Sequence, residues 1–223
     1  MINKIKSSHD EALSGISDGA SIMIGGFGDA GIPFELIDTL LAMGPTGLTL
    51  ISNNASAGER GIAALIAAGR VRKVICSHPR PPRSDIFAQA FRAGQVELEC
   101  VPQGTLAERM RAAGAGLGPF YTPTGYGTWV AKDKQTCVID GKGYVLEQPL
   151  AADFALVRAH QGDRLGNLTY RLAARNFNPV MCMAARRAIA QVDQIVQAGD
   201  IPPEQVMTQA IFVQSVVLAG TPA

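Results

Sequence analysis

The chain has 223 residues, of which 47% are apolar and 17% are charged, and its formal net charge is +1. This balance describes a globular protein and excludes an intrinsically disordered chain. The small net charge gives no basic field for nucleic acid, and no apolar run approaches the roughly 20 residues that cross a bilayer, so we expect neither a nucleic acid nor a membrane partner.

Strands and helices alternate along the first half of the chain. Short apolar runs predict strands at residues 20–24, 48–51, 71–76 and 96–101. Apolar residues at helical spacing predict helices at residues 8–16, 34–41, 61–68, 84–93 and 105–113. This alternation is typical of an α/β fold with a mostly parallel, open sheet flanked by helices, whose ligand crevice lies at the carboxyl ends of the strands.

The second half of the chain is predicted to be rich in strands. Residues 114–128 are too glycine-rich for a helix and too aromatic for a linker, so we expect an ordered surface or ligand-facing loop. Asp140-Gly141 between two apolar runs predicts a hairpin. Later strands are expected at residues 153–159, 188–196 and 211–217. No linker is evident, so we expect a single domain over residues 1–223.

The titratable side chains show no sequence pattern typical of a metal site or a catalytic acid pair. The four cysteines are far apart and the three histidines are scattered, so we expect no metal. Unpaired thiols and a polar first stretch without a signal-like apolar core indicate a cytoplasmic protein. Glu97 and Glu99 share one face of a predicted strand, and a solvated face is favoured over an acid pair.

A glycine-rich loop joins the first long strand to the next helix. Four glycines lie between Gly25 and Gly31, and Pro33 follows at the start of the helix. Glycines let a ligand approach the backbone N–H groups, and the helix N-terminus behind them favours a negative group. The loop is therefore predicted to hold an anionic or carbonyl-like ligand, although a plain turn remains the alternative.

This loop fits the dinucleotide fingerprint G-x-G-x-x-G in form, at residues 26–31. That fingerprint also expects an acidic residue about 20 positions further on. The second strand instead ends in Ser52-Asn53-Asn54, so NAD binding is disfavoured. No Lys-Ser or Lys-Thr follows the glycines either, which argues against a P-loop.

The two asparagines offer uncharged N–H donors at this strand end. Such donors suit a carbonyl oxygen that becomes an oxyanion, while an Asx turn is the structural alternative. The residues alone thus indicate an anion- or carbonyl-holding crevice without an obvious nucleophile.

Several blocks match one known family in order through nearly the whole chain. The first runs from Asp18-Gly19 through the glycine loop to Pro33. The others are residues 52–55, 102–109, 121–128, 162–164 with 166–167, and 174–177. Together they resemble the A (alpha) subunit of family I CoA-transferases, the 3-oxoacid type.

The resemblance implies half of an enzyme. In this family a heteromer of A and B subunits, or a fused chain of both, moves CoA between carboxylic acids, and the B part supplies the nucleophilic glutamate in a Ser-Glu-Asn-Gly-type motif. This chain lacks that motif, so a B subunit is expected as partner, in a heterodimer or heterotetramer. CoA and succinyl-CoA are implied as substrates, with no tightly bound cofactor and no metal.

The resemblance also assigns roles to residues. Asn53 is implied as the oxyanion donor and Gln103 as a residue that lines the acyl site. The CoA-associated loop is implied to comprise Gly25, Gly26, Phe27, Gly28, Asp29, Ala30 and Gly31.

The acceptor acid implied by the resemblance is 3-oxoadipate, with acetoacetate as the alternative. Arg80 or Arg83 is a candidate for binding the distal carboxylate of 3-oxoadipate, because a guanidinium pairs a carboxylate through two hydrogen bonds. A solvated loop arginine is the favoured alternative for both. A non-catalytic acyl-CoA-binding module is a further alternative for the whole chain.

Overall fold

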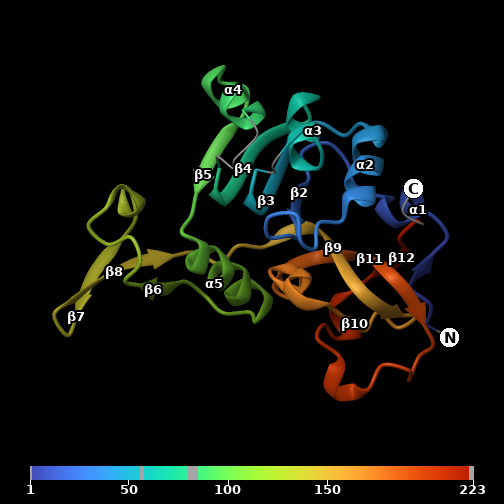
Figure 1. The fold of residues 1–223 in the computed structure, drawn as a ribbon. Helices are drawn as coiled ribbons and strands as arrows, with labels where there is room; N and C mark the ends of the chain where they lie inside the picture. The colour runs from blue at the N-terminus through green and yellow to red at the C-terminus, as the bar shows by residue number, and fades with distance from the viewer. Residues whose placement is uncertain (1, 56–57, 80–84, 221–223) are drawn as a thin grey trace.

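The structure of the protein, a computed structural model, describes residues 2–55, 58–79 and 85–220 (Figure 1). The strands are β1 (Ile5–Lys6), β2 (Ser21–Ile24), β3 (Leu48–Asn54), β4 (Val71–His78), β5 (Glu97–Cys100), β6 (Phe120–Thr122), β7 (Thr136–Ile139), β8 (Lys142–Glu147), β9 (Ala152–Asp163), β10 (Leu168–Thr169), β11 (Ala185–Val196) and β12 (Ser215–Leu218). The helices are α1 (His9–Leu13), α2 (Phe34–Met43), α3 (Ile62–Ala67), α4 (Ile86–Arg92), α5 (Gln103–Gly114) and α6 (Asn178–Ala184). Four short 3-10 helices are η1 (Trp129–Ala131), η2 (Leu172–Arg175), η3 (Pro203–Gln205) and η4 (Ala210–Phe212).

One large sheet joins the two halves of the chain. Its strands lie in the order β1-β12-β11-β9-β2-β3-β4-β5, and every neighbouring pair along this order is parallel. β10 adds to β9 in the antiparallel direction. The predicted α/β class with a mostly parallel open sheet and a strand-rich second half is therefore confirmed.

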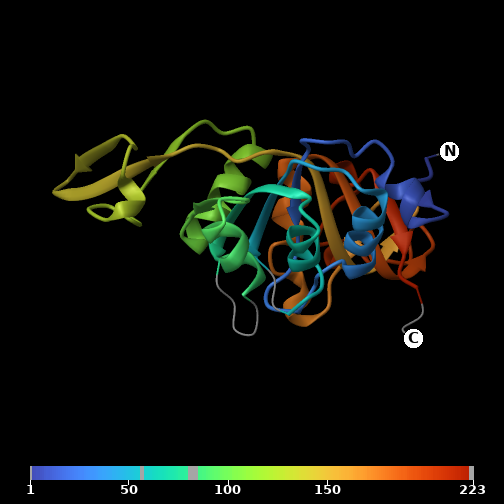
Figure 2. The ribbon, with the colours of Figure 1, turned by 90° about the horizontal axis from the view of Figure 1, so that it is seen from above.

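Helices cover both faces of this sheet (Figures 1 and 2). α1 to α4 pack on one face and α5 and α6 on the other, so the chain has two apolar cores. Successive strand residues alternate between them: Ile22 and Ile24 point into the core under α1 to α4, and Met23 points into the core under α5 and α6. Because both faces are buried, the central strands are continuous apolar runs.

Several elements differ from the prediction: the short strands β1, β6 and β10 and the 3-10 helices were not expected, and two further differences have a clear reason. α6 was not expected, because the proline at position 179 and the short apolar run after it give no helical repeat; the proline lies in the first turn, where no N–H is needed. The strand expected at residues 211–217 begins only at Ser215, after η4. Apolar residues in a 3-10 turn and in a strand look alike over so short a run.

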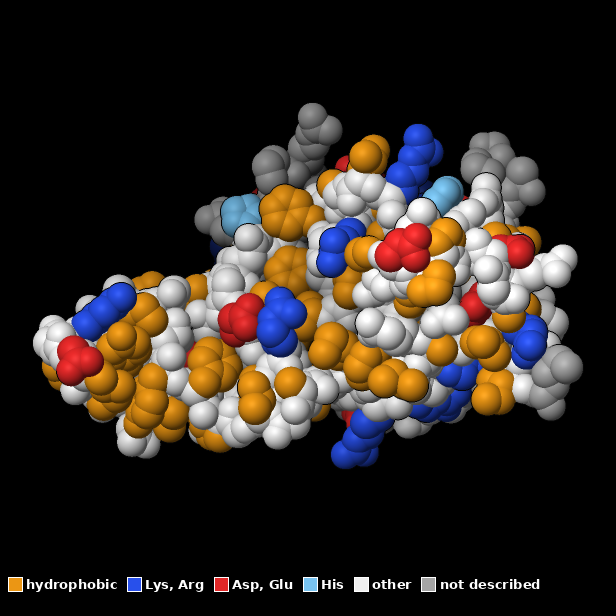
Figure 3. Space-filling model, turned by 90° about the horizontal axis from the view of Figure 1, so that it is seen from below, with side chains coloured by type: hydrophobic (Ala, Val, Ile, Leu, Met, Phe, Trp, Pro, Cys, Tyr) orange, Lys and Arg blue, Asp and Glu red, His pale blue; other side chains and the backbone are white. Residues whose placement is uncertain are grey.

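The predicted hairpin is part of an arm that projects from the body of the molecule (Figure 2). β6, β8 and β7 form a separate antiparallel sheet in that order, and Asp140 and Gly141 both have positive φ in the turn, as a tight hairpin requires. The arm carries apolar side chains at its surface, which Figure 3 shows as orange clusters. Trp129 is 70% exposed and Val138 is 62% exposed.

A chain of alternating charges fixes the base of the arm. Glu147, at the end of β8, is 2% exposed and accepts a 2.6 Å hydrogen bond from Lys134 Nζ. Its other neighbour is Arg109 of α5, whose Nε lies 3.9 Å away and donates to the Gln148 carbonyl oxygen at 2.8 Å. These contacts attach the arm to the helix that begins at the sheet edge.

The same arginine reaches one of the carboxylates expected on a solvated strand face. Arg109 Nη1 lies 2.8 Å from Glu99 Oε1, and Lys73 Nζ lies 2.6 Å from Glu99 Oε2. Burial opposes ionisation of Glu99, but hydrogen bonds from Lys73 and Arg109 outweigh it and lower the pKa of Glu99. The prediction of a solvated carboxylate is thus confirmed for Glu97, which is exposed. It is wrong for Glu99, which is half-buried and forms ion pairs with Lys73 and Arg109.

Replacement of the buried carboxylate, Glu147→Gln, is expected to lower the free energy of unfolding by about 3 kcal/mol, because it leaves Lys134 without its countercharge and Arg109 with Glu99 alone. Urea unfolding measures this loss. The control is Asp38→Asn, which removes an exposed ion pair with Arg60 and should cost less than about 1 kcal/mol. Equal losses in the two variants would show that burial adds nothing to the ion pairs at the base of the arm.

Candidate functional site

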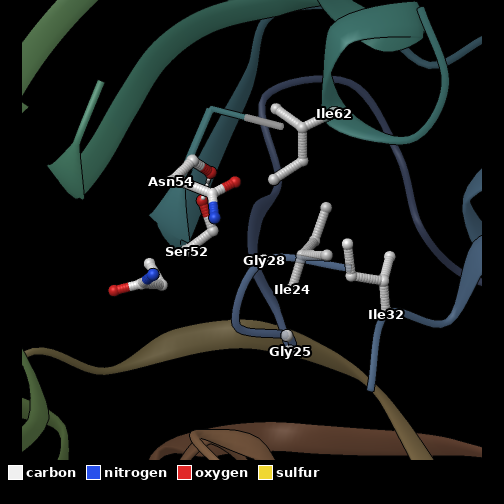
Figure 4. A pocket seen from close by; sticks show the side chains of 9 residues that line it. Ile24, Gly25, Gly28, Ile32, Ser52, Asn54 and Ile62 are labelled. Atoms are coloured by element: carbon white, nitrogen blue, oxygen red, sulfur yellow. Dashed lines mark hydrogen bonds between the residues drawn. The ribbon is translucent and has the colours of Figure 1, made fainter. Parts of the chain in front are cut away.

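Three loops meet at the carboxyl ends of the parallel strands, as predicted. The glycine loop follows β2, Ser52, Asn53 and Asn54 end β3, and Gln103 follows β5. The first two loops line one pocket, in which Ser52 and Asn54 lie on one side and Ile24, Ile32 and Ile62 on the other (Figure 4).

The glycine loop is a tight turn. Phe27 N–H donates to the Ala30 carbonyl oxygen at 3.0 Å, and Ala30 N–H donates back to Phe27 at 3.2 Å. The N–H groups of Gly25 and Gly26 also have partners, Leu156 O and Asn176 Oδ1. Within the described residues, only Gly28, Asp29 and Gly31 keep loop N–H groups without an intramolecular acceptor. Gly31 is buried, so the backbone donors available to a ligand are those of Gly28 and Asp29 at the exposed tip of the turn.

Two asparagines from the other end of the chain hold this loop. Asn176 Oδ1 accepts from Gly26 N–H at 3.1 Å, and its Nδ2 donates to Ala30 O at 3.0 Å. Asn178 is fully buried, and its Nδ2 donates to Gly31 O at 3.2 Å and to Ala174 O at 2.7 Å. Sequence reasoning gave Asn176 no role beyond its place in the family motif and did not consider Asn178, so it missed both residues as supports of the site.

Close packing explains two of the glycines. A Cβ on Gly25 would overlap the side chain of Asn178, and a Cβ on Gly31 would lie 2.6 Å from the Ala174 carbonyl oxygen. Gly31 also has φ of 74°, which disfavours any larger residue. Gly25 and Gly31 are therefore needed for close packing against Asn178 and Ala174, in addition to any role in letting a ligand approach the backbone.

Asn53 has a fixed amide. It is 5% exposed, and its Oδ1 accepts from Gln103 Nε2 at 2.7 Å and from Ser77 Oγ at 2.9 Å. Gln103 donates an N–H group, and Ser77 donates a proton that it shares with the Asn53 backbone oxygen at 2.9 Å, so the amide oxygen is turned toward these two partners. Its Nδ2 has no acceptor within the described part of the chain. The side chain is thus set as a donor with its N–H groups available, which is the geometry that an oxyanion donor needs.

Gln103 contacts Asn53 and also lines a neighbouring groove. It is exposed at the start of α5, orients Asn53 and also lines a larger groove of about 630 Å³ that continues from this edge of the sheet. The structure therefore brings Asn53, Gln103 and the glycine loop together. Arg80 and Arg83 lie outside the described residues.

The two buried thiols offer no nucleophile. All four cysteines are free, and burial raises the pKa of both Cys76 and Cys182 to about 12, so these two stay protonated at neutral pH. In the described ranges no three His, Cys, Asp or Glu side chains are grouped to hold a metal ion. None of the helices described there has the length and apolar character to span a bilayer.

The packing of Gly25 against Asn178 predicts a strong coupling. Gly25→Ala should destabilise the chain by about 2 kcal/mol through overlap, and Asn178→Ala by a similar amount because Gly31 O and Ala174 O lose a buried donor. The double variant should be more stable than the sum of the two losses predicts, by at least about 1 kcal/mol, because the shorter side chain makes room for the methyl group. Urea unfolding of the four proteins measures the coupling, and simple additivity would contradict the contact.

Curated relatives share most of their length with this chain. The A subunit of 3-oxoadipate CoA-transferase from Pseudomonas putida is 61% identical over 97% of this chain and 94% of the relative. Its counterpart from Acinetobacter baylyi is 56% identical over 100% of this chain and 98% of the relative. The alpha subunit of acetate CoA-transferase from Escherichia coli K12 is 45% identical over 94% of each chain.

Solved structures share the fold. An acyl-CoA transferase of Escherichia coli O157:H7 superposes with a TM-score of 0.85 at 24% identity, covering 98% of this chain and 47% of that chain. Glutaconate coenzyme A-transferase of Acidaminococcus fermentans gives a TM-score of 0.83 at 22% identity, covering 97% and 75%. The family model for coenzyme A transferase matches residues 6–219. By these matches, the chain belongs to the coenzyme A transferase family.

Proposed function

We propose that this chain is the A subunit of a heteromeric transferase that moves CoA from succinyl-CoA to 3-oxoadipate. The observation that carries the proposal is Asn53, whose amide is locked with its N–H groups available beside the glycine loop. The acceptor is chosen because the relatives at 61% and 56% identity are subunits of 3-oxoadipate CoA-transferases.

A second acceptor has support from other relatives. The A subunit of succinyl-CoA:3-ketoacid coenzyme A transferase from Xanthomonas campestris is 49% identical over 95% of this chain and 87% of the relative. Acetoacetate is therefore the alternative acceptor on the same site. Family membership favours either transferase over a non-catalytic acyl-CoA-binding module.

The proposed reaction divides its chemistry between two subunits. The glutamate supplied by the B subunit first attacks the thioester carbonyl of succinyl-CoA and forms an acyl-glutamyl anhydride, with CoA thiolate as the leaving group. The thiolate then attacks the glutamyl carbonyl, which releases succinate and leaves CoA as a thioester on the glutamate. The incoming acid repeats these steps in reverse and departs as its CoA thioester.

In this scheme Asn53 donates to the carbonyl oxygen while it carries negative charge. One such donor contributes about 3 kcal/mol of transition-state stabilisation. Gln103 and Ser77 act by holding the amide in that orientation. The free N–H groups of the loop are the contacts that we assign to CoA.

The need for a B subunit rests on two features. The sequence has no Ser-Glu-Asn-Gly motif to supply the nucleophile. The arm exposes Trp129, Val138 and Ile139, and such apolar surface suits a chain that a partner partly covers. We propose a heterodimer or heterotetramer in the cytoplasm, where the free cysteines remain reduced. The assignment of Arg80 or Arg83 to the distal carboxylate stays a prediction.

Incubation of the co-expressed A and B subunits with succinyl-CoA and no acceptor should produce a CoA adduct on the B subunit. Mass spectrometry of the intact subunits detects it. Addition of 3-oxoadipate should discharge the adduct faster than acetoacetate does. Discharge that favours acetoacetate would select the alternative acceptor, and absence of any adduct with both subunits present would overturn the transferase proposal.

Asn53→Asp should lower kcat/KM of the heteromer by about 100-fold, because a carboxylate of the same shape cannot donate to the oxyanion. Ser77→Ala should cost about tenfold, since the amide keeps its hydrogen bond from Gln103 and loses one of its two restraints. Steady-state kinetics with succinyl-CoA and 3-oxoadipate measures both. A loss in Ser77→Ala as large as that in Asn53→Asp would argue that the region is structural and that Asn53 donates nothing in the transition state.

A further inference from the structure

The groove beside the site combines a cation with an apolar wall. It has a volume of about 630 Å³ and is bounded by α5, α6 and the segment around η4. Phe27 of the glycine loop and Gln103 line it, so it begins where Asn53 and the loop tip lie. Arg111, two helical turns further along α5, also lines it, which gives the groove a length of about 12 Å along that helix.

Arg175 is the cation without a countercharge in this groove. It is exposed and has no ion pair or hydrogen bond in the described part of the chain, whereas Arg111 pairs with Glu108 at 3.1 Å. The next residue, Asn176, binds the backbone of Gly26, so Arg175 is anchored beside the glycine loop. An unpaired guanidinium at this position is available for a carboxylate on the ligand.

The apolar side chains that line the groove suit a short hydrocarbon chain. Met183, Met207 and Phe212 line the groove together with Val180 of α6. Methionine side chains adapt to ligands of different length because they are unbranched and flexible. The groove therefore offers contact for methylene groups between the reacting carbonyl and a distal charge.

We propose that this groove is the acyl site for dicarboxylic acids, in which Arg175 pairs with the carboxylate that does not react. The inference rests on the proposed function and explains how one site could recognise both the succinyl and the 3-oxoadipyl group. Succinyl-CoA and 3-oxoadipate both carry a second carboxylate, and acetoacetate has none. In a ping-pong cycle the leaving and the incoming acid occupy the same site in turn, so one cation serves both. The groove is long enough for the 3-oxoadipyl chain, whose second carboxylate lies two atoms further out than that of the succinyl chain.

The test measures discharge of the CoA thioester by different acids. The heteromer is charged with acetoacetyl-CoA, a donor without a free carboxylate, freed of excess donor and mixed with 3-oxoadipate, succinate or acetoacetate. Arg175→Met should lower the second-order rate of discharge by the two dicarboxylates about 10- to 100-fold, the worth of a charged hydrogen-bonded pair, and should change that by acetoacetate less than about threefold. Arg175→Lys should keep part of the rate, because it retains the charge without the two-pronged geometry.

Arg171→Met is the matched control, because Arg171 is also exposed and unpaired in the described part of the chain but does not line the groove. It should leave all three rates unchanged. An equal loss for all three acids in Arg175→Met, or no loss for the dicarboxylates, would overturn the assignment of Arg175. Failure of the unaltered heteromer to form a CoA thioester with succinyl-CoA would instead overturn the proposed function, and with it the inference that rests on it.

Discussion

The site depends on the contact between Asn178 and the glycine loop. The fully buried amide binds the backbone of Gly31, and its oxygen occupies the space that a side chain at Gly25 would need. Asn176 adds hydrogen bonds to Gly26 and Ala30. Together with the reciprocal hydrogen bonds between Phe27 and Ala30, these contacts set the shape of the loop before any ligand binds, and the N–H groups at its tip are left for recognition. A preformed loop of this kind loses little conformational entropy on binding.

A second set of hydrogen bonds fixes the chemistry on the neighbouring strand. Ser77 of β4 and Gln103 of α5 both donate to Asn53, so three adjacent elements at this sheet edge determine the direction of one amide. An oxyanion donor is effective when it needs no reorganisation during the reaction. The described chain thus prepares an environment for negative charge, while family membership and the missing motif indicate that the attacking group comes from elsewhere.

The sequence predicts local and repetitive features well. The continuous apolar run that ends at Ile24 identifies a strand buried on both faces, and Asp140-Gly141 identifies the hairpin turn. It also places Asn53 and the glycine loop at one sheet edge, because carboxyl ends of parallel strands share an edge. Contacts between distant segments carry no such pattern. Nothing near Gly25 in the sequence indicates Asn178, and nothing near Glu99 indicates that Arg109 turns back to pair with it.

Gly31 and Asn178 are 147 positions apart in the sequence, and this separation affects the order in which parts of the chain can fold during synthesis. The strand before the loop, β2, pairs with β3 on one side but with β9 on the other, and the loop itself is held by residues that follow β9. During synthesis the first half of the chain leaves the ribosome well before these residues do. The nascent chain can therefore form β2 to β5 early, but the contacts that hold its loop form only when α6 has been made.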